Sequence, residues 1–271
     1  LHEDAESSTE GSAWLITGGL GGLGMRAATL LQGTASRLVL TARSGRVSGD
    51  ALSLTANASC VVDVVSCDIA ITGDALAIGW GFAGDRRPSV LHAAGVLQDA
   101  LVPNATAKQA AEVGAPKAVG AAHLHAISSR LPIDTFIVLS SIAAAAGNVG
   151  QANYAAANTF MDGMAHDRCA LAVAGSSLQL PLIVGLGMGE GMDASKVAAK
   201  LTSQEYAKCL LAIIAPSGMA PVALPLPSIA FRERALAALT ELGVRESASE
   251  CASPEVVQAP RLDPQQISAI V

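Results

Sequence analysis

Residues 17–24 are the feature that most limits the folds open to this chain. Five of these eight residues are glycines, and they lie between an apolar run at residues 13–16 and a helical pattern at residues 23–31. Glycines allow a tight turn, and they let an anionic ligand approach backbone N–H groups at the positive end of the following helix. A strand, a glycine-rich loop and a helix in this order predict the start of a dinucleotide-binding unit.

Short apolar runs continue the pattern, and each predicts a buried strand. They occupy residues 38–40, 61–65, 90–92 and 136–139. Continuous apolar runs are typical of strands that are covered on both faces of a parallel sheet. We therefore predict the α/β class, with a Rossmann-like, doubly wound parallel sheet.

The second half of the chain predicts one long helix and several shorter elements. The long helix is expected over residues 152–173, with Phe160, Met161 and Met164 in its packed body. Further elements are expected as a strand at 177–184, a helix at 202–214 and a strand at 221–226. Residues 45–59 are short for a complete helix between two strands.

The domain organisation follows from composition. We expect a polar linker at residues 1–11 and a single catalytic subdomain at residues 12–235. Residues 236–271 are rich in Ser, Pro, Gln and Ala, a composition that predicts a linker or tail.

Charge and cysteine usage exclude several classes of protein. The net charge is −6, and the longest basic run is Arg86-Arg87, so no nucleic-acid partner is expected. Five cysteines without a C-x-x-C pair predict free thiols in a reducing compartment; we expect the cytoplasm and leave an organelle open. No metal site is predicted. No apolar run reaches the roughly 18 residues of a membrane span, and residues 1–10 lack the pattern of a signal peptide.

The glycine-rich loop supplies the first candidate ligand contacts. These are Thr17, Gly18, Gly19, Gly21, Gly22, Leu23 and Gly24. Arg43 ends the second apolar run, near the position at which NAD enzymes place an acid for the ribose 2′-hydroxyl. A guanidinium there pairs with a 2′-phosphate, so we predict NADPH as the cofactor. The alternative is that Arg43 is a solvated surface residue.

Two further segments are expected near the cofactor. Asp68 follows the third apolar run, where its carboxylate either accepts from the adenine amino group or caps a helix. The small residues Ala93, Ala94 and Gly95 follow the fourth run and allow close packing against the nicotinamide ribose. His92, at the end of that run, is interpreted as a packed strand residue and not as a ligand.

Tyr154 is the candidate acid. It lies thirteen residues after Ser141, and Ser141 ends a predicted strand. A tyrosine with a hydroxyl partner is the proton-donating half of a carbonyl reductase, since negative charge develops on the substrate oxygen during reduction. Ser140 is the alternative hydroxyl partner.

These motifs together resemble the short-chain dehydrogenase/reductase superfamily over roughly residues 12–230. Within it, the chain is similar to the catalytic half of a ketoreductase domain from a modular polyketide or fatty-acid synthase. Most members of the superfamily have Tyr-x-x-x-Lys, whereas this chain has Tyr154-x-x-x-Asn158. The synthase ketoreductases take their lysine from a preceding Pro-Lys-x-x-Gly-x-x-x-Leu-His segment, which residues 116–125 match.

The resemblance implies a catalytic set of Lys117, Ser141, Tyr154 and Asn158. It implies NADPH-dependent reduction of a 3-ketoacyl thioester, tethered to an acyl carrier protein, to the 3-hydroxyacyl thioester in polyketide or fatty-acid biosynthesis. Lys117 would stabilise the Tyr154 phenolate and hold the cofactor ribose, and Asn158 would anchor a water that restores the proton.

The same resemblance suggests how the product configuration is set. Residues 97–99 read Leu-Gln-Asp and resemble the Leu-Asp-Asp signature of ketoreductases that give the D-hydroxy product. Position 146 is Ala, where the opposite class carries Trp. Asp99 is alternatively an ordinary loop residue. Further substrate contacts are expected from Gln151, Met188 and Met192, the last two in a glycine-rich stretch, residues 185–196, that reads as a lid or as a disordered loop.

The implied partners are the acyl carrier protein and neighbouring synthase domains. Synthase ketoreductases usually carry a preceding structural half, and no such length precedes Trp14; we expect that this half was cut away or that this version lacks it. Two rival interpretations stay open. One is a free-standing reductase that acts on an untethered ketone, and the other is an inactive ketoreductase relic with a structural role.

Overall fold

The computed structural model describes residues 11–47, 49–82, 84–85, 88–191, 200–214 and 222–223. Its main sheet has seven described strands, all parallel, in the order β3-β2-β1-β4-β5-β6-β9. Their bounds are β1 Ser12–Thr17, β2 Ala35–Ala42, β3 Val61–Ser66, β4 Pro88–His92, β5 Thr135–Ser141, β6 Ser176–Leu180 and β9 Val222–Ala223. A second sheet pairs β7 (Leu182–Ile183) with β8 (Lys200–Leu201). The predicted fold class is confirmed.

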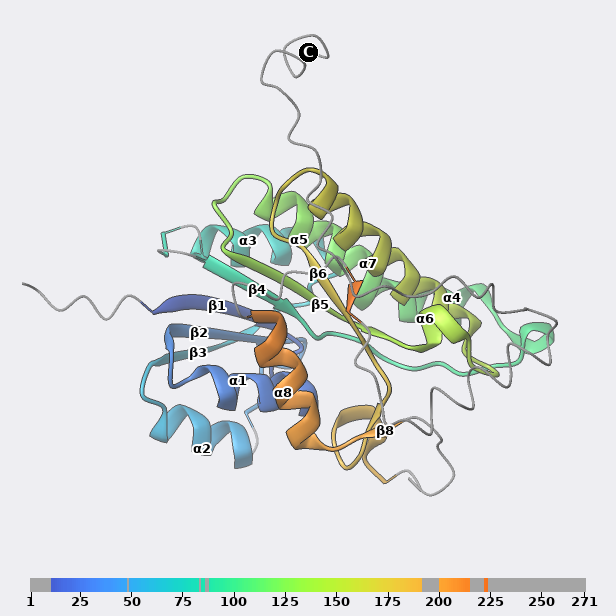
Figure 1. Ribbon diagram of the computed structural model, residues 1–271, viewed down its shortest axis with the longest axis horizontal. Helices are drawn as coiled ribbons and strands as arrows, with labels where there is room; N and C mark the ends of the chain where they lie inside the picture. The colour runs from blue at the N-terminus through green and yellow to red at the C-terminus, as the bar shows by residue number, and fades with distance from the viewer. Residues whose placement is uncertain are drawn as a thin grey trace, which may run out of the picture. The chain divides into compact units, whose positions relative to one another are not determined.

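Helices cover both faces of the main sheet (Figure 1). One face carries α1 (Gly22–Leu31), α2 (Gly49–Asn57) and α8 (Ser203–Ile214), and the other carries α3 (Thr72–Phe82), α5 (Gly120–Ser128) and α7 (Ala152–Ala170). The shorter helical elements are η1 Val102–Asn104, α4 Ala107–Gly114, η2 Ala115–Val119, α6 Ala143–Ala146 and η3 Gly187–Gly189. No helix among the described residues is long and apolar enough to cross a membrane.

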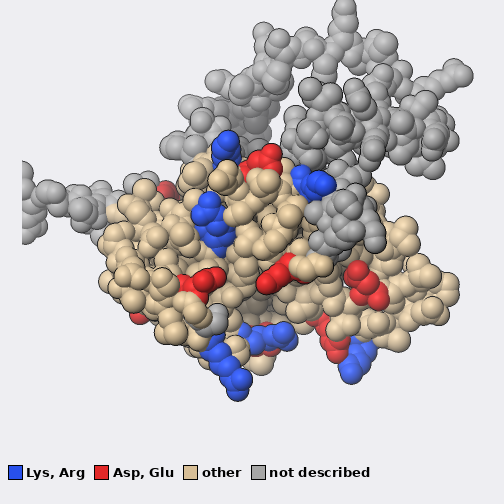
Figure 2. Space-filling view, turned by 90° about the horizontal axis from the view of Figure 1, so that it is seen from below, with Lys and Arg blue, Asp and Glu red and all other residues tan. Residues whose placement is uncertain are grey.

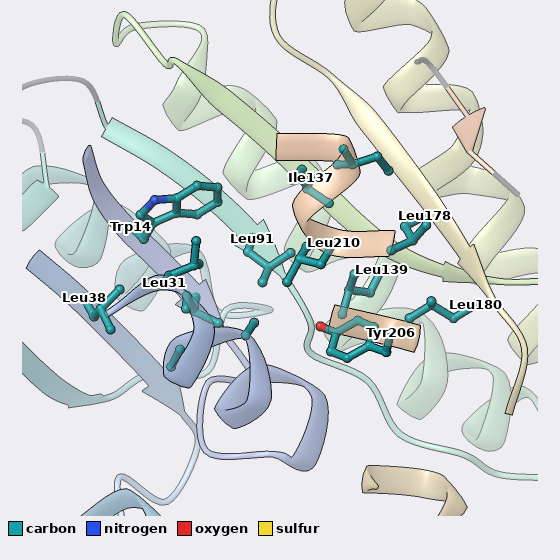
Figure 3. Close-up of a cluster of buried hydrophobic side chains, with 14 of the residues drawn as sticks. Trp14, Leu31, Leu38, Leu91, Ile137, Leu139, Leu178, Leu180, Tyr206 and Leu210 are labelled. Carbon is teal, nitrogen blue, oxygen red and sulfur yellow. The ribbon is translucent and has the colours of Figure 1, made fainter. Parts of the chain in front are cut away.

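Two apolar clusters, one on each face of the sheet, form the core. Successive residues of β1 alternate between them, so Trp14 and Ile16 face α1 and α8, whereas Leu15 faces α3, α5 and α7. Figure 3 shows the first cluster, where Tyr206 and Leu210 of α8 meet side chains from the central strands. Burial on both faces explains why the strands read as continuous apolar runs.

The structure corrects two expectations about helices. Residues 45–59 do contain a helix, α2, whose nine residues pack through Ala51 and Leu54 only. On α7, Met161 is buried but Phe160 is 48% exposed. Ala157, Met161 and Ala165 recur every four residues and face the sheet, and this spacing turns Phe160 toward solvent.

The strand expected at residues 177–184 is divided into β6 and β7, and the helix expected to reach residue 173 ends at Ala170. Cys60, Cys67, Cys169 and Cys209 are free thiols. Residues 1–10 and 224–271, which include the predicted tail, lie outside the described part of the chain.

The sheet order fixes where a ligand can bind. The chain moves outward from β1 to β2 and β3, and then returns to the other side of β1 with β4. Such a reversal opens a crevice at the carboxyl ends of the central strands. Thr17, His92 and Ser141, the last residues of β1, β4 and β5, therefore lie at the same edge.

Candidate active site

The glycine-rich loop crosses the carboxyl edge of the sheet between β1 and α1. Gly18 has a φ of +67°, and a Cβ there would lie 2.8 Å from the carbonyl carbon of Ala93. The Gly19 N–H donates to the Thr41 carbonyl at 2.9 Å, and the Ala93 N–H donates to the Thr17 carbonyl at 3.0 Å. The loop is thus fastened to the strands on both sides of β1.

The N-terminus of α1 fits an anionic group. Its N-cap, Gly21, offers no side-chain cap, and the first turn holds no acidic residue. The first N–H groups of the helix are therefore left for a ligand, and the helix dipole favours negative charge there. This cradle of glycine backbone and uncapped N–H groups suits the pyrophosphate of a dinucleotide.

Gly18→Ala tests the cradle. An Ala side chain would need a left-handed backbone and would press on Ala93, so we expect a loss of about 1–3 kcal/mol in the free energy of unfolding. We also expect the affinity for a reduced dinucleotide to fall at least roughly tenfold, because the loop must move. Gly33→Ala is the matched control, since nothing lies within 4 Å of its Cβ position. Urea unfolding and dinucleotide fluorescence measure both effects; equal behaviour of the two variants would contradict the cradle.

Arg43 and Asp68 follow the carboxyl ends of β2 and β3. Arg43 follows β2 directly and is exposed, free of ion pairs with other described residues. One Asp68 oxygen accepts from the Ala70 N–H at 3.0 Å and closes a turn before α3. The structure thus gives Asp68 a turn-forming role, and its contact with adenine stays a prediction.

The four expected catalytic side chains converge on the carboxyl end of β5. Lys117 Nζ donates to Asn158 Oδ1 at 3.0 Å and to the Leu139 carbonyl at 3.1 Å. The same ammonium lies 5.1 Å from the centroid of the Tyr154 ring. Asn158 Nδ2 donates to the Tyr154 carbonyl at 2.8 Å, one turn earlier on α7. The residues from η2, β5 and α7 thus form one connected group.

Burial sets the charge state of Lys117. Its side chain is only 4% exposed, and burial lowers the pKa of the ammonium to about 7, against the opposing effect of the Asp162 carboxylate. Gly95 makes room for this side chain, because a Cβ there would lie 2.8 Å from Lys117 Cε. The small residue predicted for cofactor packing therefore also shapes the lysine pocket.

Tyr154 keeps its proton at neutral pH. Burial raises the pKa of its phenol above 10.0, hydrogen bonding to Asn158 and Ser141 lowers it, and the charge of Asp99 raises it. A protonated phenol is the form that a general acid needs. Lys117 stands nearby to stabilise the phenolate that proton donation would leave.

The choice between the two serines is decided by the strand. Ser141 is half-buried and hydrogen-bonds with Tyr154, whereas Ser140 is buried and its hydroxyl has no partner among the described residues. Consecutive residues of a strand point to opposite faces, so only one of them can face the tyrosine. The structure thus favours Ser141 over Ser140, and the role of Ser141 as the hydroxyl partner of Tyr154 stays a prediction.

Comparison with known proteins identifies the family. The KR domain model matches residues 12–185. The chain belongs to the ketoreductase (KR) domain family. It is similar to polyketide synthase GfsA of Streptomyces halstedii, with 37% identity over 192 residues, which cover 66% of this chain and 2% of that protein.

Solved structures agree with this assignment. A structure of A-type ketoreductases from a modular polyketide synthase superposes with a TM-score of 0.72 at 29% identity, covering 80% of this chain and 48% of that one. A short-chain dehydrogenase from Sphingobium yanoikuyae in complex with NADPH shares the fold, with a TM-score of 0.68 at 18% identity over 89% of this chain and 99% of that one. This ketoreductase domain thus spans a small part of the synthase and about half of the solved ketoreductase chain. Its fold implies a nicotinamide cofactor.

Residues 97–99, which are expected to control stereochemistry, are hydrogen-bonded to the residues just before Tyr154. Gln151 Nε2 donates to Asp99 Oδ2 at 2.9 Å, and Asn153 Nδ2 donates to the Gln98 carbonyl at 2.9 Å. The structure therefore brings Asp99 and Gln151 together at the start of α7.

The start of the expected lid packs against the nucleotide loop. A Cβ on Gly22 would lie 2.3 Å from the Gly187 nitrogen, so the two backbones meet without side chains between them. Met188 reaches Gly95, with its Cε 3.3 Å from the Gly95 Cβ position. Met192 lies outside the described residues. The described part of the lid thus joins the glycine loop to the lysine pocket.

Two buried side chains that contact the expected site were not included in it from the sequence. Asp162 is buried one turn after Asn158 and accepts hydrogen bonds from Ser177 Oγ at 2.5 Å and Gln179 Nε2 at 2.7 Å. The spacing of Tyr154, Asn158 and Asp162 by four residues was the available signal. His92 is the second such position, since it contacts both the nucleotide loop and the Lys117 segment.

The charged surface of the ketoreductase domain is mixed. On the described part of the face in Figure 2, Lys and Arg are interspersed with Asp and Glu and form no continuous basic area. This face offers no track for a polyanion.

Proposed function

We propose that this ketoreductase domain uses NADPH to reduce a 3-ketoacyl thioester, carried by an acyl carrier protein, to the 3-hydroxyacyl thioester. The observation that supports this most directly is the hydrogen-bonded group of Lys117, Asn158 and Tyr154, with Ser141 beside the phenol. It lies at the sheet edge that carries the glycine loop, where a dinucleotide and a carbonyl can meet.

The side chains divide the work of carbonyl reduction. A bound reduced nicotinamide would supply a hydride, which is one proton with two electrons, to the carbonyl carbon. Tyr154 gives its hydroxyl proton to the carbonyl oxygen, and Ser141 donates a hydrogen bond to that oxygen. Lys117 stabilises the phenolate by its charge. Asn158 holds the lysine and a water, through which Tyr154 regains a proton from solvent.

The D-hydroxy product is proposed from the segment around Asp99. Its carboxylate lies close enough to Tyr154 to raise the pKa of the phenol, and Gln151 fixes it by a hydrogen bond. The synthase relatives support an acyl carrier protein and neighbouring synthase domains as partners.

The test is reduction of a 3-ketoacyl thioester surrogate, followed by the absorbance of NADPH. Turnover with the thioester, and a D-hydroxy product on chiral chromatography, is the expected result. A folded domain that binds NADPH without turnover would instead favour the inactive relic. Faster turnover of free ketones than of a carrier-bound thioester would favour the free-standing reductase.

Arg43→Ala tests the choice of cofactor. Arg43 is exposed at the end of β2, and a charge-assisted contact with the 2′-phosphate contributes about 1.5–3 kcal/mol. We therefore expect the KM for NADPH to rise roughly 10- to 100-fold, with little change for NADH. Arg130→Ala, at an exposed arginine after α5, is the control. An equal effect of Arg43→Ala on both cofactors would remove the 2′-phosphate role.

A further inference from the structure

His92 occupies the centre of the sheet, between the two parts of the site. It is the last residue of β4 and is fully buried. In the parallel pairing, Thr17 of β1 lies on one side of it and Val138 of β5 on the other. The imidazole therefore stands between the strand that leads into the nucleotide loop and the strand that carries Ser141.

Both ring nitrogens of His92 have partners. Nδ1 lies 2.6 Å from Thr17 Oγ1, and Nε2 lies 3.1 Å from the Lys117 carbonyl oxygen. A carbonyl only accepts, so Nε2 carries the proton and donates it to this oxygen. Nδ1 is then the acceptor, and the Thr17 hydroxyl donates to it.

The neutral ring suits this pattern. Burial, and then the positive charge of Lys117, lower the pKa of His92 to about 4. A protonated ring would have two donors and would lose its acceptor for the Thr17 hydroxyl. At neutral pH the tautomer is therefore fixed by its two partners.

The Lys117 carbonyl belongs to an irregular turn. Lys117 lies in the π-helical element η2, directly after Pro116, which lacks an N–H and interrupts the helix begun by α4. Within this stretch the Gly120 N–H reaches the Ala115 and Lys117 carbonyls, and His92 adds a contact to the Lys117 carbonyl from outside the helix. His92 holds the carbonyl of Lys117, while Leu139 and Asn158 hold its ammonium.

Close packing leaves the imidazole little freedom. A Cβ on Gly120 would lie 3.3 Å from His92 Cε1, so the first residue of α5 packs directly against the imidazole. Thr17, His92 and Lys117 thus form a continuous, buried chain of contacts from the nucleotide loop to the catalytic lysine.

We propose that His92 is a positioning residue, which sets the backbone of Lys117 relative to the nucleotide loop. This inference rests on the proposed function, because Lys117 acts there on the phenolate and on the cofactor ribose. His92 touches neither substrate nor cofactor in this scheme. Its role is to keep the lysine in register with Thr17, so that the lysine and the bound dinucleotide meet correctly.

Graded variants test the role in turnover. His92→Phe removes both hydrogen bonds and keeps a buried ring, and we expect kcat to fall by up to roughly 100-fold, as for a misplaced catalytic group. His92→Gln keeps a donor for the Lys117 carbonyl, so its loss in kcat should be several-fold smaller. In both, kcat should fall more than the KM for the thioester changes. His123→Phe is the control, because His123 also contacts a backbone carbonyl, that of Ile69, but lies outside the site; its kcat should stay within about twofold.

A double-mutant cycle with Thr17→Val locates the effect. If His92 links Thr17 to Lys117, the double variant Thr17→Val/His92→Gln should lose less in kcat than the product of the two single losses. Multiplicative losses would overturn the link. A wild-type kcat in His92→Phe, with an unchanged Tm, would overturn the positioning role itself.

A spectroscopic measurement keeps the inference testable if His92→Phe does not fold. In 15N-labelled protein, the His92 signals, assigned by their loss in His92→Gln, should show a neutral ring with the proton on Nε2 from about pH 6 to 8. A ring that titrates in this range, or one protonated on Nδ1, would contradict the proposed contacts. Because this readout needs no substrate, an inactive wild type would refute the proposed function and leave the His92 contacts to be judged separately.

Discussion

Tyr154→Phe is expected to lower kcat for the 3-ketoacyl thioester by roughly 10²- to 10⁴-fold, the contribution of a positioned general acid. The substitution removes only the hydroxyl that faces Ser141 and leaves the ring beside Lys117 in place. Affinity for NADPH should therefore change little. Single-turnover rates and fluorescence titration of the cofactor separate these two effects.

The chain offers a matched control for this variant. Tyr206 is the other tyrosine, and its buried hydroxyl donates to the Leu23 carbonyl at 3.2 Å. Tyr206→Phe removes one hydrogen bond, so it should cost about 1 kcal/mol of unfolding free energy and less than roughly tenfold in kcat. If Tyr206→Phe lost as much activity as Tyr154→Phe, the acid would not be Tyr154.

The separation in sequence between the residues of the site explains which parts of it could be predicted. Tyr154 and Asn158 lie one turn apart on α7, and the glycine loop is continuous, so local patterns were enough to find them. The first five strands of the main sheet were equally readable, because each contains an apolar run, whereas β6 carries the buried polar residues Ser176, Ser177 and Gln179. Lys117 was predicted as a catalytic residue only from the family resemblance, because its partners Leu139 and Asn158 lie on other elements.

Contacts between distant elements explain what was missed. The bond from Thr17 to His92 spans 75 residues of sequence, and no local pattern predicts it. The carboxylate of Asp162 accepts hydrogen bonds from Ser177 and Gln179 of β6, which lie 15 and 17 residues further along the chain. Contacts between side chains on different strands are difficult to predict from a single sequence, because the order of the strands determines them and local spacing does not.

Lys117→Met should remove most of the activity. The variant keeps the length of the side chain and deletes the charge that stabilises the Tyr154 phenolate. Loss of one such preorganised contact lowers kcat by roughly 10²- to 10³-fold. Steady-state kinetics with saturating NADPH measure it. Full activity in Lys117→Met would mean that another group stabilises the phenolate.

The same variant should change how stability depends on pH. In the folded protein, burial lowers the pKa of Lys117 from 10.5 to about 7, while the unfolded chain keeps the ordinary value. Between pH 7 and 8.5 the unfolded state therefore binds more protons at this position, so the free energy of unfolding rises with pH. The slope from this group is at most about 1.4 kcal/mol per pH unit. Below pH 7 both states are protonated, and the cost of the buried charge stays constant.

Urea unfolding of wild type and Lys117→Met at a series of pH values isolates this contribution. The other groups cancel in the difference, and the described cysteine thiols titrate above 9.0 because burial raises their pKa. Lys108→Met, at a lysine 84% exposed on α4, should keep the wild-type slope. Equal slopes in wild type and Lys117→Met would show that the ammonium is not destabilised by burial. A lost slope together with lost turnover would show that the domain gives up stability near neutral pH to keep a charge beside Tyr154.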